Sequence, residues 1–229
     1  MITKKESVAL GWCDNGNTDG KFVEGLVSIF THGKSLGLNI DSFVRVEGNQ
    51  IGRQRQALFD CWANDSQDDW LLWIDSDIHI TAETLKKIWD TADKEKRPVV
   101  SGTYFISKQL DGSLMVPFPA LFNDLSEFAI EYVHPLPVDE VVRCDSAGMG
   151  LVIMHRSIIS KLREKYPNQS LFAEQEGIED EYIGEDVVFF RKLKAAGIPL
   201  HAHTGAIATH VKRFQLNVDY YNLYWTSKV

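Results

Sequence analysis

The sequence contains few cysteines and no long apolar run. Its 229 residues include only three cysteines, Cys13, Cys61 and Cys144, which are far apart and form no Cys-x-x-Cys pair. We therefore expect neither a disulfide framework nor a cysteine zinc site, and a reducing compartment is the simplest interpretation. No apolar run approaches the ~20 residues of a membrane span, and the N-terminal segment lacks the apolar core of a signal peptide. These absences predict a cytoplasmic protein without a membrane span.

Positive charge is also scarce. The chain has 24 Lys+Arg against 32 Asp+Glu, which gives a formal net charge of −8. Non-specific nucleic-acid binding requires a clustered basic surface, so we do not expect it here, although a local basic pocket for a small anion remains compatible with this charge. The 44% hydrophobic content is typical of a globular protein, and the length suits one domain. Since the sequence shows no repeat or linker, we predict a single domain over residues 1–229.

Strand-like and helical segments alternate along the first half of the chain. This order indicates an α/β fold in which right-handed crossovers place helices on both faces of a sheet. The unbroken apolar run WLLWI is typical of a strand covered on both faces. Between residues 112 and 154, short β-like pieces predict a change to mixed pairing. The expected strands are 7–12, 42–47, 70–74 and 99–104, and the expected helices are 22–33, 57–62, 81–92, 157–166 and 185–196.

Local signals refine two of these helices. Helical spacing predicts that the second helix buries Ala57, Leu58, Cys61 and Trp62. Thr81 precedes the third helix, and its hydroxyl is well suited to cap the free backbone N–H groups there.

The tripeptide Asp75-Ser76-Asp77 follows the buried strand directly. Ligands of open α/β sheets bind at the carboxyl ends of the strands, so two carboxylates at this point lie where function is expected. Such a pair can hold a hard divalent cation, directly or through water, and the cation can neutralise a diphosphate. The alternative is a turn in which one aspartate caps the helix that begins near Thr81.

A second acidic pair, Glu185-Asp186, opens the last predicted helix. The helix dipole and the free amides of a first turn favour acidic residues, which is a complete structural explanation. A carboxylate at a helix N-terminus beside the sheet edge is also a plausible general base for an acceptor hydroxyl.

Three histidines, His201, His203 and His210, fall within ten residues. Neutral imidazole is a good ligand for manganese-like or zinc-like ions, although a single histidine is more often structural. His210 is the strongest candidate because Lys212 and Arg213, two cations that could reach a phosphate, follow it.

Two arginines and a glycine complete the candidate residues. Arg53 and Arg55 stand near a helix start, where the dipole disfavours cations, so either an anionic ligand or a salt bridge could account for them. Gly148 could allow a substrate to approach the backbone closely, and a β-turn would explain it equally well.

Taken in order, these segments resemble the GT-A fold of nucleotide-sugar glycosyltransferases, and most closely the small single-domain members found in bacteria and phages. The resemblance spans nearly the whole chain and depends on the order of its motifs rather than on any one of them. The motifs are VALGWCDNG, GRQRQALFD, WLLWIDSDIHIT, VVSGTYFISK, CDSAGMGLVIMHR, GEDVVFFRKLKAAGIPL and ATHVK.

The resemblance implies a metal site and a catalytic base. Asp77 would bind Mn²⁺ (or Mg²⁺) directly, Asp75 would contact the ribose or the hydrated metal, and His210 would complete the metal site. Asp186 would deprotonate the acceptor hydroxyl in an inverting reaction, with Glu185 in support. Inversion is therefore the outcome that we expect, although the GT-A fold also supports retention.

The resemblance further implies a site for a UDP-sugar donor, with UDP-glucose as a representative. Residues 1–110 would form the nucleotide-binding half and residues 111–229 the acceptor and catalytic half. Gln56 stands where many relatives have asparagine, which leaves the nucleotide open. The residues expected to hold the donor are Gly11, Trp12, Arg53, Arg55, Asp75, Ser76, Gly148 and Lys212.

The expected activity is transfer of a hexose to a hydroxyl acceptor, with slow hydrolysis of the donor when no acceptor is present. Two alternatives remain. A strand followed by Asp-x-Asp also resembles haloacid-dehalogenase-type phosphatases, which have Thr or Val where this chain has His79 and carry the motif nearer the N-terminus. A sugar-nucleotide-binding protein without catalysis is the other.

Overall fold

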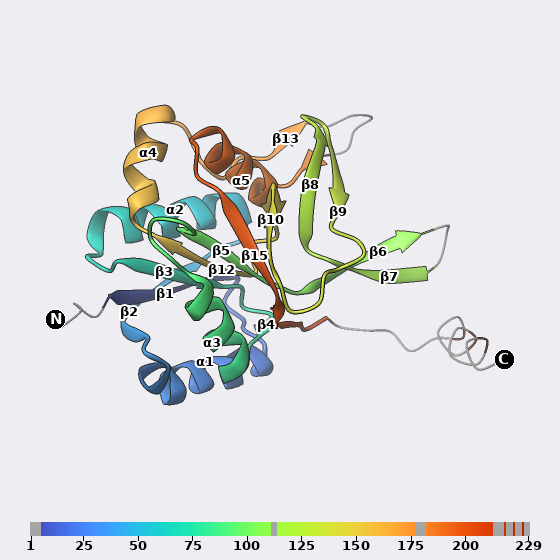
Figure 1. Cartoon of the computed structure of the whole chain (residues 1–229), viewed down its shortest axis with the longest axis horizontal. Coiled ribbons are helices and arrows are strands. Elements are labelled where there is room, and N and C mark those ends of the chain that lie inside the picture. The colour runs from blue at the N-terminus through green and yellow to red at the C-terminus, as the bar shows by residue number, and fades with distance from the viewer. Residues whose placement is uncertain are drawn as a thin grey trace.

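A computed structural model describes residues 6–110, 114–176 and 182–212, together with the single positions 218, 222 and 226. Its centre is a seven-stranded sheet flanked by helices (Figure 1). The helices are α1 (Gly20–His32), the short 3₁₀ helix η1 (Gly33–Leu36), α2 (Ile51–Asp65), α3 (Ala82–Thr91), α4 (Ser157–Lys165) and α5 (Glu185–Ala195).

The central sheet is mixed, as the sequence predicted. In spatial order its strands are β10 (Val141–Cys144), β15 (Leu200–Ile207), β5 (Val99–Thr103), β12 (Leu151–His155), β3 (Trp70–Ile74), β1 (Ser7–Asp14) and β2 (Asn39–Glu47). β1 pairs in parallel with both β2 and β3, whereas β12 runs antiparallel to β3 and β5. β15 is parallel to β5, and β10 is antiparallel to β15.

Short strands outside this sheet build the other half of the molecule. A hairpin of β6 and β7 projects beside the three-stranded sheet β11-β8-β9 (Figure 1). Two further antiparallel pairs, β16 with β4 and β13 with β14, connect loop segments. The bounds of these strands are β4 (Ile78–His79), β6 (Phe105–Leu110), β7 (Leu114–Pro119), β8 (Leu121–Ser126), β9 (Ala129–Tyr132), β11 (Ser146–Ala147), β13 (Gln175–Glu176), β14 (Tyr182–Ile183) and β16 (Thr209–His210).

Helices cover both faces of the central sheet, and the apolar character of β3 explains why. All five residues of β3 are buried. Figure 1 shows α1 and α3 on one face and α2, α4 and α5 on the other. Two hydrophobic clusters correspond to these faces, and alternate residues of β3 belong to each: Leu71 and Trp73 to one, Trp70, Leu72 and Ile74 to the other.

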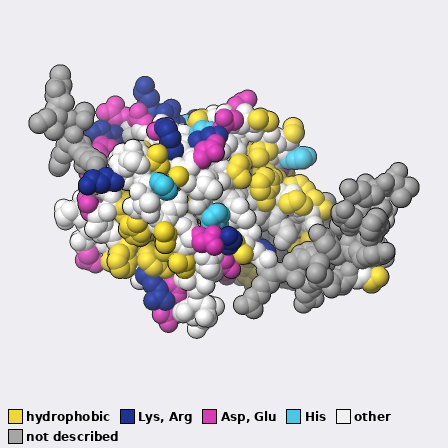
Figure 2. Space-filling view, turned by 90° about the horizontal axis from the view of Figure 1, so that it is seen from below, with side chains coloured by type: hydrophobic (Ala, Val, Ile, Leu, Met, Phe, Trp, Pro, Cys, Tyr) yellow, Lys and Arg dark blue, Asp and Glu magenta, His cyan; other side chains and the backbone are white. Residues whose placement is uncertain are grey.

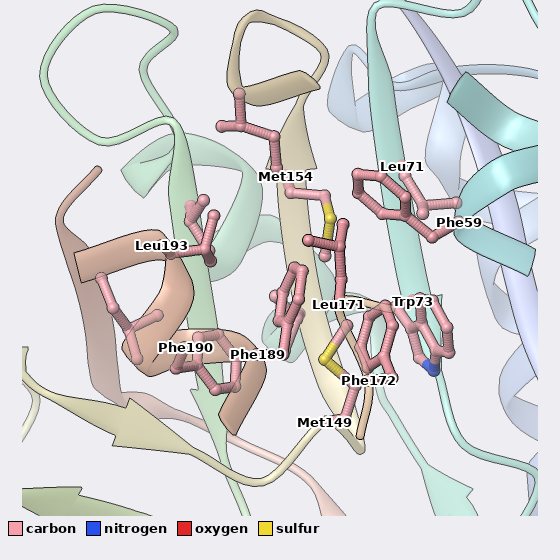
Figure 3. Packing of buried hydrophobic residues seen from close by; sticks show 14 of the residues in the cluster. Phe59, Leu71, Trp73, Met149, Met154, Leu171, Phe172, Phe189, Phe190 and Leu193 are labelled. Carbon is pink, nitrogen blue, oxygen red and sulfur yellow. The ribbon is translucent and has the colours of Figure 1, made fainter. Parts of the chain in front are cut away.

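An aromatic stack fills the core between β3 and α5 (Figure 3). Phe172 and Phe189 lie nearly parallel, with ring centroids 4.3 Å apart and an interplanar angle of 11°. Phe172 also packs on Trp73, at 6.0 Å between centroids. The segment before β13 is therefore packed against the strand that leads into Asp75.

The local predictions for two helices met different outcomes. Thr81 caps α3 as expected, because its hydroxyl accepts a hydrogen bond from the Thr84 backbone N–H at 3.1 Å. The predicted buried stripe of α2 was partly wrong: Ala57 is exposed and Cys61 half-buried, whereas Leu58, Phe59 and Trp62 face the core. Alanine and cysteine fit either environment, so their spacing alone does not identify the buried face.

The surface on the side of α1 and α3 carries both apolar and charged side chains (Figure 2). Figure 2 views the molecule from the side of α1 and α3, where hydrophobic side chains gather in patches between scattered charges. α1 contributes the exposed apolar residues Val23, Val27 and Phe30. Within the described part of the chain, no helix combines the length and the apolarity that crossing a bilayer requires.

We expect the Leu72→Ala substitution in β3 to lower the free energy of unfolding by about 2–5 kcal/mol, because the fully buried side chain leaves a cavity between packed layers. Val138→Ala is the control: that side chain is 86% exposed, and its loss should change stability by less than about 0.5 kcal/mol. Urea unfolding monitored by tryptophan fluorescence measures both. Equal midpoints for the two variants would contradict the burial of β3 on both faces.

Candidate functional site

A group of carboxylates surrounds one buried arginine at the carboxyl end of β3. Asp75 directly follows β3, Glu185 begins α5, and Arg55 comes from α2. Arg55 Nη2 donates to Asp75 Oδ2 at 2.9 Å, and Arg55 Nη1 donates to Glu185 Oε1 at 2.6 Å. The fold thus joins two motifs that are 110 residues apart in sequence (185 − 75 = 110) through one guanidinium group.

Both oxygens of Asp75 are engaged by the protein. Oδ2 takes the hydrogen bond from Arg55, and Oδ1 accepts from Trp73 Nε1 at 3.1 Å. The predicted metal trio of Asp75, Asp77 and His210 is not assembled here: over the ranges that the structure describes, no three His, Cys, Asp or Glu residues lie close enough together to hold a metal ion. A contact of Asp75 with the ribose or the hydrated metal remains a prediction.

Asp77 and His210 do meet, as the sequence predicted. Pairing of β16 with β4 places His210 opposite Ile78, and His210 Nε2 lies 3.1 Å from Asp77 Oδ2. Lys212 Nζ donates to the same oxygen at 2.8 Å. Burial opposes ionisation of Asp77, but the hydrogen bonds from His210 and Lys212 outweigh it and lower the pKa of Asp77 to about 2. Arg213, the other predicted cation, lies outside the described residues.

The contacts of His210 suit a metal ligand. Its Nδ1 lies 3.0 Å from the Phe105 carbonyl oxygen, and its Nε2 faces the Asp77 carboxylate. A neutral imidazole has one N–H, so when that N–H is on Nδ1 and donates to the carbonyl, Nε2 can bind a cation that takes the place of its hydrogen bond to Asp77. A second hydrogen bond to a backbone carbonyl is the usual way in which proteins orient a metal-binding histidine. Asp77 and His210 therefore fit a shared divalent cation.

Asp186 lies next to this group in the first turn of α5. Burial raises the pKa of Asp186, while the nearby positive charge of Arg55 opposes that rise. Its Oδ1 accepts a hydrogen bond from the Val187 backbone N–H at 2.8 Å. A half-buried carboxylate with a raised pKa has the character that a general base requires.

The residues predicted around the nucleotide are spread over several elements. Gly11 lies inside β1, and a Cβ there would lie 2.9 Å from Leu58 and 3.0 Å from Leu71, so core packing by itself accounts for this glycine. Trp12 stacks on Phe43 with centroids 5.7 Å apart. Its Nε1 donates to Asp14 Oδ2 at 3.1 Å.

Arg53 and Ser76, two other residues predicted to hold the UDP-sugar, lie in different places. Arg53 is exposed on the first turn of α2, away from the buried position of Arg55 two residues later. Ser76 lies in the turn between the two aspartates, and its carbonyl accepts from the backbone N–H of Asp19, the residue that caps α1. The 75–77 turn is thereby anchored to the start of α1.

Sequence reasoning missed Tyr104, which is 6% exposed and packs against His210 edge to face, with centroids 5.2 Å apart. Its Oη accepts from the Gly150 backbone N–H at 3.2 Å, and a Cβ on Gly148 would lie only 2.0 Å from that oxygen. Gly148 is thus required by Tyr104 rather than by a turn. The available signal was an aromatic residue directly after the strand at 99–103.

Sequence reasoning also missed an ion pair at the ends of β1 and β2. Arg45 contacts the buried Asp14 twice, Nε to Oδ2 at 2.6 Å and Nη2 to Oδ1 at 2.7 Å. These contacts, with the backbone N–H of Gly16, lower the pKa of Asp14 even though burial opposes this.

The remaining histidines do not join the site. His201 and His203 lie on β15, next to β10 at the edge of the central sheet. Burial lowers the pKa of both side chains, and His203 Nδ1 accepts from the Gly205 backbone N–H at 3.1 Å. Of the three histidines, His210 is the one that contacts the Asp-x-Asp motif.

No protein-family model and no curated protein matches the sequence. The solved structures that match over most of the chain include the following two. The protein A197 from STIV is 18% identical with a TM-score of 0.56, over 90% of this chain and 86% of A197. GalNAc-T7, solved with UDP, GalNAc and Mn²⁺, is 10% identical with a TM-score of 0.60, over 91% of this chain. The fold is GT-A. The chain spans 44% of the GalNAc-T7 chain, and at these identities the likeness concerns the fold alone.

We expect Gly148→Ala to destabilise the protein by about 1–3 kcal/mol, because the new methyl group would overlap the buried Tyr104 ring. Gly20→Ala is the matched control: a Cβ at this first residue of α1 meets nothing within 4 Å, so stability should stay the same or rise by up to ~1 kcal/mol. Thermal and urea unfolding compare the two. Equal stability of both variants would contradict the close packing of Tyr104 on Gly148.

Proposed function

We propose that the protein is a metal-dependent glycosyltransferase that transfers a hexose from a UDP-sugar to a hydroxyl acceptor. The observation that carries the proposal is the 3.1 Å contact between Asp77, in the turn after β3, and His210, near the end of the described chain. An aspartate and an imidazole at the carboxyl edge of an α/β sheet form a donor set suited to Mn²⁺. The GT-A fold supports the same conclusion.

Asp77 and His210 would hold the metal, and the hydrogen bond from His210 Nδ1 to Phe105 would keep Nε2 directed at it. The metal would supply positive charge that stabilises the leaving diphosphate. Lys212, which is exposed beside Asp77, would add charge at the same place. Trp12, near the carboxyl end of β1, and Phe43, on the adjacent strand β2, would lie beside the uracil base of the donor.

Asp186 would serve as the general base. The acceptor oxygen would bond to the anomeric carbon as the bond from that carbon to the UDP oxygen breaks, and the hydroxyl proton would pass to Asp186. One direct displacement inverts the anomeric centre. Residues 1–110 would form the nucleotide-binding half, and residues 111–229 would supply the base, the acceptor contacts, His210 and Lys212, within a single catalytic domain.

The contacts of Asp75 weigh against the phosphatase alternative. A haloacid-dehalogenase-type mechanism needs the first aspartate of the motif as a nucleophile with a free oxygen. Here Arg55 and Trp73 engage the two oxygens of that residue. The other alternative is a sugar-nucleotide-binding protein without catalysis, and the effects of the Asp77→Ala and Asp186→Ala variants on binding and transfer distinguish it from a transferase.

Asp77→Ala and Asp186→Ala should have different effects. The first should weaken Mn²⁺-dependent UDP binding by at least about 100-fold, because a charged metal ligand is lost. The second should leave UDP binding within a few-fold but lower transfer by roughly 10²–10⁴-fold, the usual contribution of a general base. Calorimetry and product formation measure the two. Asp90→Ala, an exposed residue on α3, is the control. Wild-type transfer by Asp186→Ala would overturn the assigned base.

A donor screen tests the reaction class before the acceptor is known. Incubation with individual nucleotide sugars should release UDP slowly from one UDP-hexose when Mn²⁺ is present and should stop with EDTA, because water replaces the acceptor hydroxyl. Release should return when Mn²⁺ is restored in excess over EDTA. Equal release from every nucleotide, or release that EDTA does not affect, would contradict metal-dependent transfer from UDP-sugars.

A further inference from the structure

Arg55 holds together three elements of the proposed active site. Its side chain is 7% exposed and reaches from α2 to Asp75 at the end of β3 and to Glu185 at the start of α5. These two contacts span 20 and 130 residues of sequence. One buried cation therefore determines how far the Asp-x-Asp segment lies from the helix that carries Asp186.

The contacts of Arg55 leave little access for a donor phosphate. Its two terminal nitrogens are paired with carboxylates at 2.9 and 2.6 Å, and its Nε is enclosed by protein without a hydrogen-bond partner among the described residues. These contacts use two of the five N–H groups, but the side chain is only 7% exposed, so a diphosphate could reach the guanidinium only if Asp75 or Glu185 moved away, which would leave a carboxylate buried without its cation. Breaking such a buried pair is costly.

The Arg55–Glu185 ion pair anchors the start of α5. Its N-cap residue, Gly184, provides no side-chain cap, so the helix start lacks the usual local anchor. α2 also approaches closely here: a Cβ on Gly52 would lie 2.8 Å from the Phe172 carbonyl oxygen and 3.7 Å from the Glu185 side chain. The Arg55–Glu185 ion pair forms across this narrow contact.

We propose that Arg55 is a positioning residue that places Asp186 relative to the bound donor, and that it does not itself bind the nucleotide or diphosphate. This inference rests on the proposed function. It replaces the donor-contact role that the resemblance implied for Arg55. Because Glu185 precedes Asp186 in the first turn of α5, loss of the ion pair would move the base, and a displacement of about 1 Å can cost 10²-fold in rate.

The test separates binding from turnover. UDP binding in the presence of Mn²⁺ is measured by calorimetry, and UDP release from a saturating UDP-hexose gives kcat and KM, for wild type, Arg55→Gln and Arg55→Lys. Arg163→Gln, an exposed arginine on α4, is the matched control. We expect Arg55→Gln to bind UDP within threefold of wild type while kcat falls at least 100-fold. Arg55→Lys should fall less, about 10-fold, because an ammonium group keeps the charge but loses the fork geometry.

A double variant tests whether a loss of activity in Arg55→Gln comes from misfolding. Arg55→Gln leaves buried carboxylates without their cation, whereas Arg55→Gln with Glu185→Gln removes one of those charges as well. Circular dichroism identifies variants that fold. If Arg55 acts through Glu185, Arg55→Gln should lower kcat much less in the Glu185→Gln background than in the wild-type background. Equal effects in the two backgrounds would overturn the inference.

The remaining outcomes distinguish this inference from the proposed function. Loss of UDP affinity in Arg55→Gln in proportion to loss of kcat would make Arg55 a donor ligand and overturn the inference alone. A wild-type kcat in Arg55→Gln would do the same. A wild-type protein that releases UDP from no UDP-sugar would overturn the proposed function, and the inference with it.

Discussion

The burial of β3 on both faces constrains the rest of the structure. Its five apolar residues need helices above and below them, and this requirement creates the layered fold. A carboxylate is costly to bury within a strand that is covered on both faces, so the first one in this segment is Asp75, directly after the end of β3. The turn that follows is held by backbone hydrogen bonds from Ile78 to Asp75 and from Asp19 to Ser76. Core packing thus places the candidate site at one edge of the sheet.

Several of the acidic side chains lie at that edge of the central sheet. Asp75, Glu185 and Asp186 gather around the single guanidinium of Arg55, while Asp77 is paired with Lys212. Three carboxylates around one buried cation leave an excess of negative charge, which favours a further cation nearby. The same net charge of −8 that argues against a nucleic-acid surface is therefore compatible with a nucleotide bound through a metal ion.

Several features of the fold and the site could be predicted because their signals are local. The apolar run of β3, the cap at Thr81 and the position of Asp77 after a buried strand each depend on neighbouring residues. The resemblance placed His210 in one metal site with Asp77, and the structure brings these two side chains together. The pairing of Asp75 with Arg55, the packing of Tyr104 and the ion pair of Asp14 with Arg45 join residues from different elements, and no local pattern marks them.

The sequence by itself therefore determined the α/β class of fold and the edge of the sheet that carries the carboxylates. These follow from hydrophobic periodicity and from polar residues at strand ends. Only the tertiary structure decided which partner each charged group has. A buried guanidinium must be neutralised by whatever carboxylates folding brings near it, and for Arg55 these are Asp75 and Glu185. That pairing is the basis of the positioning role that we propose for Arg55, in place of the donor contact that the resemblance implied.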